Sequence, residues 1–307
     1  MKKLALGLLV SSFFAGILHA AKRPNVVFLV SEDNSVHYLR HYGAEFGAMP
    51  NVEKLAASGL TFNHAFSNAP VCSVARSTLA TGLLAPRAGF QYHRKSALAN
   101  LPKGFKPWTF LLKKAGYHCT NNRKTDYNFY HNGKEIWNLS SNKASWKSRP
   151  NKDMPFFHMQ SFAQCHESSL HFPAKLMKTE RTKTPQDKVK LHPYHPDTPT
   201  FRYTHARYFD RMKVVDELMG KVVASLEADG LLEDTFIFYF GDHGGVLPRG
   251  KGYAYESGLH VPLVIRIPEN FKDLVDHEKG SRTDGFVSFI DFGPTVLHLA
   301  GLKVPQQ

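Results

Sequence analysis

The chain has 307 residues, of which 42% are hydrophobic and 21% are charged, and its formal net charge is +13. This composition is enough for one large globular domain or two modest ones, and it excludes a disordered, fibrous or polytopic membrane protein. The positive charge suits acidic partners such as sulfated glycans, nucleic acid or anionic surfaces. Nucleic acid is discounted because the sequence has no arginine-rich tract and no recognisable nucleic-acid module.

The first twenty residues have the pattern of a signal peptide. Lys2 and Lys3 form its positive end, residues 4–17 form a short apolar core, and Leu18-His19-Ala20 precedes a cleavage site before Ala21. The apolar run is short for a membrane span. We therefore expect export to the periplasm or beyond, no stable membrane insertion, and a single domain over residues 21–307.

A buried strand is expected at residues 25–30, where Asn-Val-Val-Phe-Leu-Val is a continuous apolar run. It ends in Glu32 and Asp33. Residues 50–58 are expected to be helical, with Gly59 as the stop, and residues 60–66 to form a strand.

A helix is expected to begin near Cys72, which would place Arg76 one turn later on the same face. The thiol would then lie at a helix N-terminus beside a guanidinium, an arrangement that favours a tetrahedral oxyanion. Taken alone, the stretch is equally well read as a buried cysteine and a surface arginine. Three cysteines are present, and an odd count in an exported chain marks one thiol, here Cys72, for a role other than pairing. Whether Cys119 and Cys165 pair is left open.

The remaining chain alternates helices and strands. We expect helices at 108–115 and 203–229, strands at 117–120, 155–162, 235–240 and 261–267, and a long surface excursion near the substrate entrance at about 175–200. This alternation predicts an α/β fold with a largely parallel central sheet and helices on both faces.

Two of the buried strands end in acidic or imidazole groups, Glu32-Asp33 and Asp242-His243. Open α/β sheets place their sites at the carboxyl edge of the strands, and carboxylates meeting there can hold a hard cation such as Ca²⁺. Each pair alone is more often a cap or a solvated loop.

The sequence from Cys72 to Gly82 resembles the signature of the type I sulfatases, Cys-x-Pro-x-Arg or Cys-x-Ala-x-Arg followed by Leu-x-Thr-Gly. Val74 departs from the third position of that signature. Residues 23–33 resemble the family's opening, with Glu32 in place of the first of two aspartates. Residues 240–244 resemble its later metal segment, and residues 251–263 its Lys-x-x-x-Tyr-Glu-x-Gly-x-x-x-Pro segment.

The resemblance implies an alkaline phosphatase-like fold and a sulfuric ester hydrolase acting on a sulfated carbohydrate. A formylglycine-generating or sulfatase-maturing enzyme would oxidise Cys72 to formylglycine, whose hydrate attacks sulfur. One calcium ion is implied, with the ligands Glu32, Asp33, Cys72, Asp242 and His243. Arg76 would stabilise the nucleophile, Lys124 and Lys251 would contact the sulfate, and His166 would protonate the leaving alcohol.

Two further residues, Asp126 and His93, are expected near the same site. Asp126 stands where the family has a histidine, so it is read as a base, a metal-facing group or a contact to a substrate hydroxyl. His93 is expected to approach the pocket.

The resemblance also implies a smaller C-terminal subdomain that this sequence lacks, so a fragment or a truncated product is expected. Two alternatives stay open: a phosphate or phosphonate ester hydrolase on the same scaffold, and a degenerate, non-catalytic binder of sulfated polymers.

Overall fold

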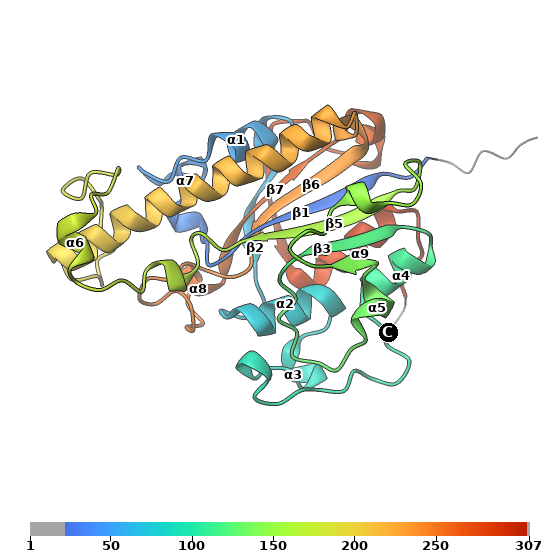
Figure 1. Ribbon diagram of the computed structural model, residues 1–307, viewed down its shortest axis with the longest axis horizontal. Helices are drawn as coiled ribbons and strands as arrows, with labels where there is room; N and C mark the ends of the chain where they lie inside the picture. The colour runs from blue at the N-terminus through green and yellow to red at the C-terminus, as the bar shows by residue number, and fades with distance from the viewer. Residues whose placement is uncertain (1–21, 306–307) are drawn as a thin grey trace, which may run out of the picture.

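Eight strands form one mixed sheet in the computed structural model, which describes residues 22–305 (Figure 1). Their order across the sheet is β4-β3-β5-β1-β6-β7-β2-β8. The strands are β1 (Asn25–Ser31), β2 (Gly59–Phe66), β3 (His118–Asn122), β4 (Leu139–Ser140), β5 (Phe156–Phe162), β6 (Thr235–Gly241), β7 (His260–Arg266) and β8 (Ser281–Ser288).

The centre of the sheet is parallel, and its register aligns the strand ends that matter for function. β1 pairs in parallel with β5 and β6, and Ser31 lies opposite Gly241. The residues that follow β1 and β6 therefore leave the sheet at the same edge. β7 is antiparallel to both of its neighbours, β6 and β2. The predicted largely parallel sheet is thus confirmed, with β7 as the exception.

Helices cover both faces of the sheet (Figure 1). α1 and α7 lie on one face, and α2, α4 and α9 lie on the other. The helices are α1 (Pro50–Ala57), α2 (Cys72–Thr81), α3 (Ala85–Ala88), α4 (Trp108–Lys114), α5 (Gly133–Ile136), α6 (Leu176–Thr179), α7 (Pro199–Ala228), α8 (Glu256–Leu259) and α9 (Phe289–Leu299). The expected helices near residue 72 and at 108–115 and 203–229 correspond to α2, α4 and α7.

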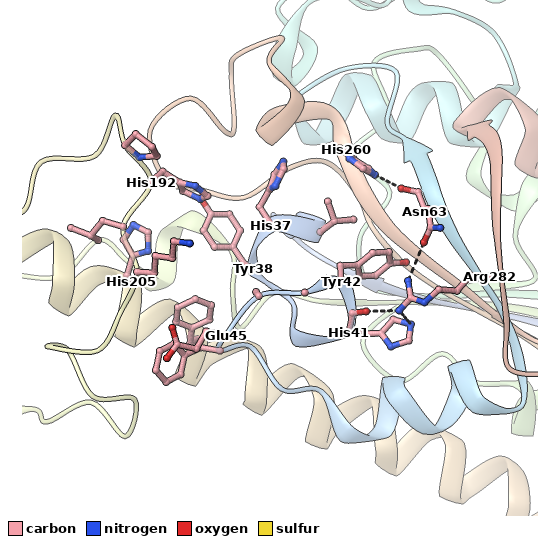
Figure 2. A pocket seen from close by; sticks show the side chains of 18 residues that line it. His37, Tyr38, His41, Tyr42, Glu45, Asn63, His192, His205, His260 and Arg282 are labelled. Atoms are coloured by element: carbon pink, nitrogen blue, oxygen red, sulfur yellow. Dashed lines mark hydrogen bonds between the residues drawn. The ribbon is translucent and has the colours of Figure 1, made fainter.

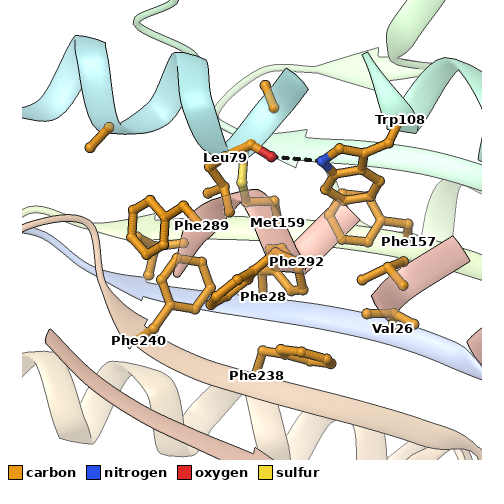
Figure 3. Packing of buried hydrophobic residues seen from close by; sticks show 14 of the residues in the cluster. Val26, Phe28, Leu79, Trp108, Phe157, Met159, Phe238, Phe240, Phe289 and Phe292 are labelled. Carbon is orange, nitrogen blue, oxygen red and sulfur yellow. Dashed lines mark hydrogen bonds between the residues drawn. The ribbon is translucent and has the colours of Figure 1, made fainter. Parts of the chain in front are cut away.

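Alternation along β1 divides its side chains between two cores, because successive side chains of a strand point to opposite faces. Val27 and Leu29 pack under α1 and α7, whereas Phe28 joins the core beneath α2, α4 and α9. Figure 3 shows Phe28 surrounded by aromatic rings, with the centroids of Phe157 and Phe238 each 5.0 Å away. This second core holds α2 firmly on the sheet, since all ten residues of α2 are buried.

Three further expectations concern cysteines, the surface segment and the membrane. Cys72, Cys119 and Cys165 are all free thiols and all buried. Residues 175–200 contain the short helix α6 and the first two residues of α7, and they are mostly exposed or half-buried. Within residues 22–305, no helix combines the length and the apolar character needed to cross a membrane. The expected signal peptide lies outside the described residues.

Candidate active site

Cys72 is the first residue of α2, and its thiol lies beneath the carboxyl edge of the sheet. Val71 precedes the helix in an extended conformation and provides no side-chain cap, so the first N–H groups of α2 have no side-chain acceptor from that position. The Cys72 Sγ lies 3.1 Å from Nε2 of His243 and 3.8 Å from Oδ1 of Asp33. The expected meeting of the cysteine with the two strand ends is therefore present.

Four side chains that could act as metal ligands form one compact group. Asp33, Cys72, Asp242 and His243 each offer one ligand atom, and these atoms all lie within 4.8 Å of one another. They come from the end of β1, the start of α2 and the end of β6. His243 Nε2 is 2.9 Å from Oδ1 of Asp33, and all four residues are buried.

Opposite charges stabilise this buried group. Burial raises the pKa of Asp33, but the charge and the hydrogen bond of His243 outweigh it and hold that pKa well below its ordinary value. Burial lowers the pKa of His243, while Asp242 and Asp33 together raise it well above the ordinary value. Burial and the charge of Asp242 raise the pKa of Cys72, but hydrogen bonds with His166 and His243 lower it to about 7. The protein thus favours an anion at residue 72 and a cation among the two carboxylates.

Arg76 lies behind the group rather than in open solvent. Its Nε donates to Oδ2 of Asp242 at 3.1 Å, and its Nη1 donates to Oγ of Ser161 at 3.0 Å. Only 1% of the Arg76 side chain is exposed. Arg76 therefore fixes and neutralises Asp242.

Glu32 is close to the group of four but is not one of its members. Its carboxylate accepts a hydrogen bond from Lys124 Nζ at 2.8 Å and lies 3.6 Å from Nη2 of Arg76. Its longer side chain, compared with an aspartate, is directed at these two cations. A role for Glu32 as a metal ligand stays a prediction.

Lys251 and His166 lie next to Asp33, outside the group of four. Lys251 Nζ donates to Oδ2 of Asp33 at 2.9 Å and is 3.2 Å from Nε2 of His166. The backbone N–H of Glu167 also donates to Asp33, at 2.9 Å. Lys124, Lys251 and His166 are only partly buried, with 18%, 9% and 14% of their side chains exposed, so they line the open side of the group.

His93 and Asp126 lie near the group of four, and each contacts a residue beside it. His93 Nδ1 is 2.9 Å from Oγ of Ser73, next to Cys72. Asp126 lies 3.7 Å from Nη2 of Arg94 and 3.9 Å from Nζ of Lys124. Among the residues described, Asp126 is therefore paired with cations and is not one of the four potential metal ligands.

Several supporting contacts were not predicted from the sequence. The hydroxyl of Tyr208, on α7, donates to the backbone carbonyl of Asp33, and Cys165 Sγ donates to that of Glu32 at 2.8 Å. Arg94 and Glu167 were also not predicted, although each directly follows a predicted site histidine, His93 or His166. The contacts of Tyr208 and Cys165 join segments far apart in sequence, and no local pattern indicates them.

A separate cavity of about 1010 Å³ opens beside the 3₁₀ helix η1 (Val36–Tyr38). Figure 2 shows the rings of His37, Tyr38, His192 and His205 around it. Burial lowers the pKa of His192 to about 4 and that of His205 to about 3, with neighbouring histidines adding to the effect. None of the four potential metal ligands lines this cavity. It is lined by these rings and by the charged side chains of Glu45, Lys190 and Arg282, and it is distinct from the group of four.

Comparisons with known proteins agree on one family. A sequence model of the sulfatase family matches residues 24–302. An ulvan-active sulfatase of Formosa agariphila is 33% identical over 327 residues, which cover 93% of this chain and 53% of that protein. An N-acetylgalactosamine-6-sulfatase of Rattus norvegicus is 27% identical over 98% of this chain and 65% of that protein.

A solved structure has the same fold. The phosphonate monoester hydrolase of Agrobacterium radiobacter superimposes with a TM-score of 0.72 over 92% of this chain and 74% of that chain, at 17% identity. This likeness confirms the predicted fold class. The chain spans between about half and two thirds of the length of the two curated relatives.

Proposed function

The chain belongs to the sulfatase family, and on that premise we propose that it is an exported hydrolase of sulfate esters on a carbohydrate. The observation that carries the proposal is the meeting of Asp33, Cys72, Asp242 and His243 in one buried group. Lys124, Lys251 and His166 border that group. Ulvan is the first polysaccharide to test, because it is named for the 33% identical relative.

We propose that the buried group holds a calcium ion. The donor set suits a divalent cation, because it combines two carboxylates of lowered pKa with a nitrogen of His243 and the side chain of residue 72. Asp242 and Asp33 raise the pKa of His243 well above its ordinary value, so the group attracts positive charge, and binding the cation would displace the proton of the ring. When bound, the cation would neutralise negative charge on the ester.

Residue 72 would supply the nucleophile after maturation. A formylglycine-generating or sulfatase-maturing enzyme would convert the Cys72 thiol into an aldehyde, and a hydroxyl of its hydrate would attack sulfur. The second hydroxyl then allows sulfate to be expelled and the aldehyde regenerated, which a thiolate cannot do. The helix N-terminus and the neighbouring cations favour negative charge at this position.

The partly exposed side chains would handle the sulfuryl group and the alcohol. Lys124 and Lys251 would exchange part of their contact with Glu32 and Asp33 for contact with sulfate oxygens. His166 would protonate the leaving alcohol. Hydrogen bonding to Cys72 raises the pKa of His166 against the effect of burial, and the charge of Asp33, which would remain after maturation, raises it as well.

Peptide mass spectrometry of residues around Cys72, on protein from the native host, is the first test. An aldehyde in place of the thiol supports the enzyme, whereas an unmodified thiol supports a non-catalytic binder of sulfated polymers. A screen of sulfated monosaccharides and ulvan, with and without chelator, then tests substrate and cation.

The second candidate is a phosphate or phosphonate ester hydrolase, favoured by the structural likeness to the phosphonate monoester hydrolase. Both esters present a tetrahedral oxyanion but differ in charge. Paired assays on aryl sulfate, aryl phosphate and aryl phosphonate separate the two. A preference for either phosphorus ester would overturn the sulfatase proposal.

A further inference from the structure

Arg94 lies at the rim of the candidate active site, outside every motif described above. It belongs to the 3₁₀ helix η3 (His93–Lys95), and 49% of its side chain is exposed. Its Nη2 lies 3.7 Å from Oδ2 of Asp126. Burial lowers the pKa of Arg94, but the charges of Asp126 and Cys72 raise it above its ordinary value. Arg94 is therefore a further cation near residue 72, in addition to Lys124 and Lys251.

The backbone around Arg94 is fixed to the start of α2. The N–H of Arg94 donates to Oγ of Ser73 at 2.9 Å, and the His93 ring lies 2.9 Å from the same oxygen. Ser73 directly follows Cys72, so the position of Arg94 is tied to that of residue 72. Arg94 has a φ of 52°, a left-handed conformation that costs energy for an arginine. Such strain persists only where the surrounding contacts enforce it.

Asp126 is held in a matching way from the other side. Its φ is 54°, and its Oδ2 is buried without a hydrogen bond. Two residues later, the Asn128 side chain donates to Oγ of Ser73 at 3.2 Å and to the carbonyl of Phe90 at 3.2 Å. Arg94 is thus anchored on Ser73 through its own backbone N–H, and the segment that carries Asp126 is anchored there through Asn128.

The charges of Arg94 and Lys124 explain how Asp126 can lie beside a sulfate site. A lone carboxylate at position 126 would repel a sulfate ester. Here Asp126 lies 3.7 Å from Arg94 and 3.9 Å from Lys124. Because Lys124 is also bonded to Glu32 at 2.8 Å, Arg94 is the cation that offsets the negative charge of Asp126. The 3.7 Å approach to Asp126 is longer than a hydrogen bond, so the guanidinium can also bind a second oxyanion, and guanidinium geometry suits tetrahedral oxyanions.

We propose that Arg94 is a further catalytic residue, which binds sulfuryl oxygens beside residue 72, and that Asp126 is a positioning residue that aims Arg94. This inference rests on the proposed function and adds a group to its site. Arg94 supplies positive charge at the corner where the family's usual histidine is replaced by Asp126.

Binding of inorganic sulfate tests the inference without requiring turnover. Isothermal titration of the full chain is compared with Arg94→Ala and with Arg87→Ala, an exposed arginine on α3 that serves as the matched control. We expect Arg94→Ala to weaken sulfate binding at least tenfold and Arg87→Ala to leave it within twofold. Equal affinities for the unsubstituted chain and Arg94→Ala would overturn the inference.

Turnover gives the second readout, with rates divided by the aldehyde content at residue 72 so that a maturation defect is not mistaken for a catalytic one. Arg94→Ala should lower kcat/KM for an aryl sulfate about 100-fold, the scale of losing one group that stabilises a transition-state oxyanion. Arg94→Lys should recover part of that loss, because the charge returns without the fork geometry. If the unsubstituted chain does not hydrolyse sulfate esters, the proposed function fails, while the sulfate titration still decides the role of Arg94.

Asp126→Asn separates positioning from general-base catalysis. A positioning residue predicts that Asp126→Asn lowers kcat/KM without changing the shape of its pH profile, and that it adds little further loss in the Arg94→Ala background. Loss of the acidic limb of the pH profile in Asp126→Asn would assign Asp126 as a base and overturn its positioning role.

Discussion

The Sγ of Cys72 lies 3.1 Å from Nε2 of His243, although 171 residues separate the two in sequence. Cys72 begins α2, and His243 follows β6 by two residues. The contact therefore joins a helix N-terminus to the carboxyl edge of a buried sheet. Both elements are fixed by apolar packing, so the relative positions of Cys72 and His243 are set before any substrate arrives.

Asp33→Asn should abolish cation binding. The substitution removes one of two carboxylate charges from the buried group, so the group of four loses much of its attraction for calcium. For the unsubstituted chain, calcium at 100 times its Kd should add about 2.7 kcal/mol of stability, seen as a higher Tm. Asp33→Asn should lose this shift, while the exposed control Asp153→Asn should keep it. An undiminished calcium shift in Asp33→Asn would remove Asp33 from the ligand set.

His166→Gln should affect substrates according to their leaving group. Without the imidazole, a sugar alcohol must depart without a proton, and loss of a general acid costs about 10²–10⁴ in rate. A nitrophenolate leaves readily unprotonated, so kcat for nitrophenyl sulfate should fall less than about tenfold. The exposed control His171→Gln should leave both rates unchanged. Equal losses on both substrates would show that His166 is not the acid.

Val74→Pro should raise the fraction of chains matured at Cys72. Proline restores the third position of the family signature, and Val74 lies in the first turn of α2, where a backbone N–H has no acceptor within the helix. Peptide mass spectrometry after co-expression with a maturing enzyme measures the aldehyde fraction. Val74→Thr, which keeps the size of valine, should give no gain. A lower fraction in Val74→Pro than in the parent would show that valine suits the maturing enzyme.

Acid should destabilise the fold partly through His158 on β5. Burial lowers the pKa of His158 to about 4, and its Nδ1 lies 2.8 Å from Oγ1 of Thr120. Because the unfolded chain takes up this proton near the ordinary pKa of 6.5, stability falls as the pH drops below that value. Between pH 7 and pH 5 this single group should cost roughly 2 kcal/mol.

His158→Gln should therefore lose less unfolding free energy than the parent between pH 7 and pH 5, by about that amount. Urea unfolding at the two pH values measures the difference. The exposed variant His171→Gln should follow the parent. If His158→Gln has the same pH dependence as the parent, His158 is not the group that links protonation to unfolding.

The sequence predicted which strands and which helix carry the site, because the patterns that indicate these elements are local. The apolar runs at β1 and β6 are each followed by polar side chains, and parallel pairing brings such ends together. The helix beginning at Cys72 was also predicted, since the run that follows it is compatible with a helix. These patterns require only the residues within one element.

Other features depend on contacts that no local pattern encodes. The antiparallel direction of β7 follows from its pairing with β2 and β6, because a buried apolar run reads the same in either direction. The orientation of Glu32 toward Lys124 depends on a loop that is 92 residues away. Arg94 is positioned by contacts with Ser73 and Asp126, which are distant from it in the sequence.

Within residues 22–305, β8 is an edge strand of the sheet, and its outer backbone groups have no strand to pair with. Along this free border stand Arg282 and Asp284, followed by Gly285, and such charges and breaks discourage edge-to-edge pairing between copies. The ring of Phe286 is nevertheless 77% exposed and stacks on His64. Self-association of the chain at high concentration should therefore proceed through ring contacts at Phe286 and not through growth of a fibrous β-ribbon.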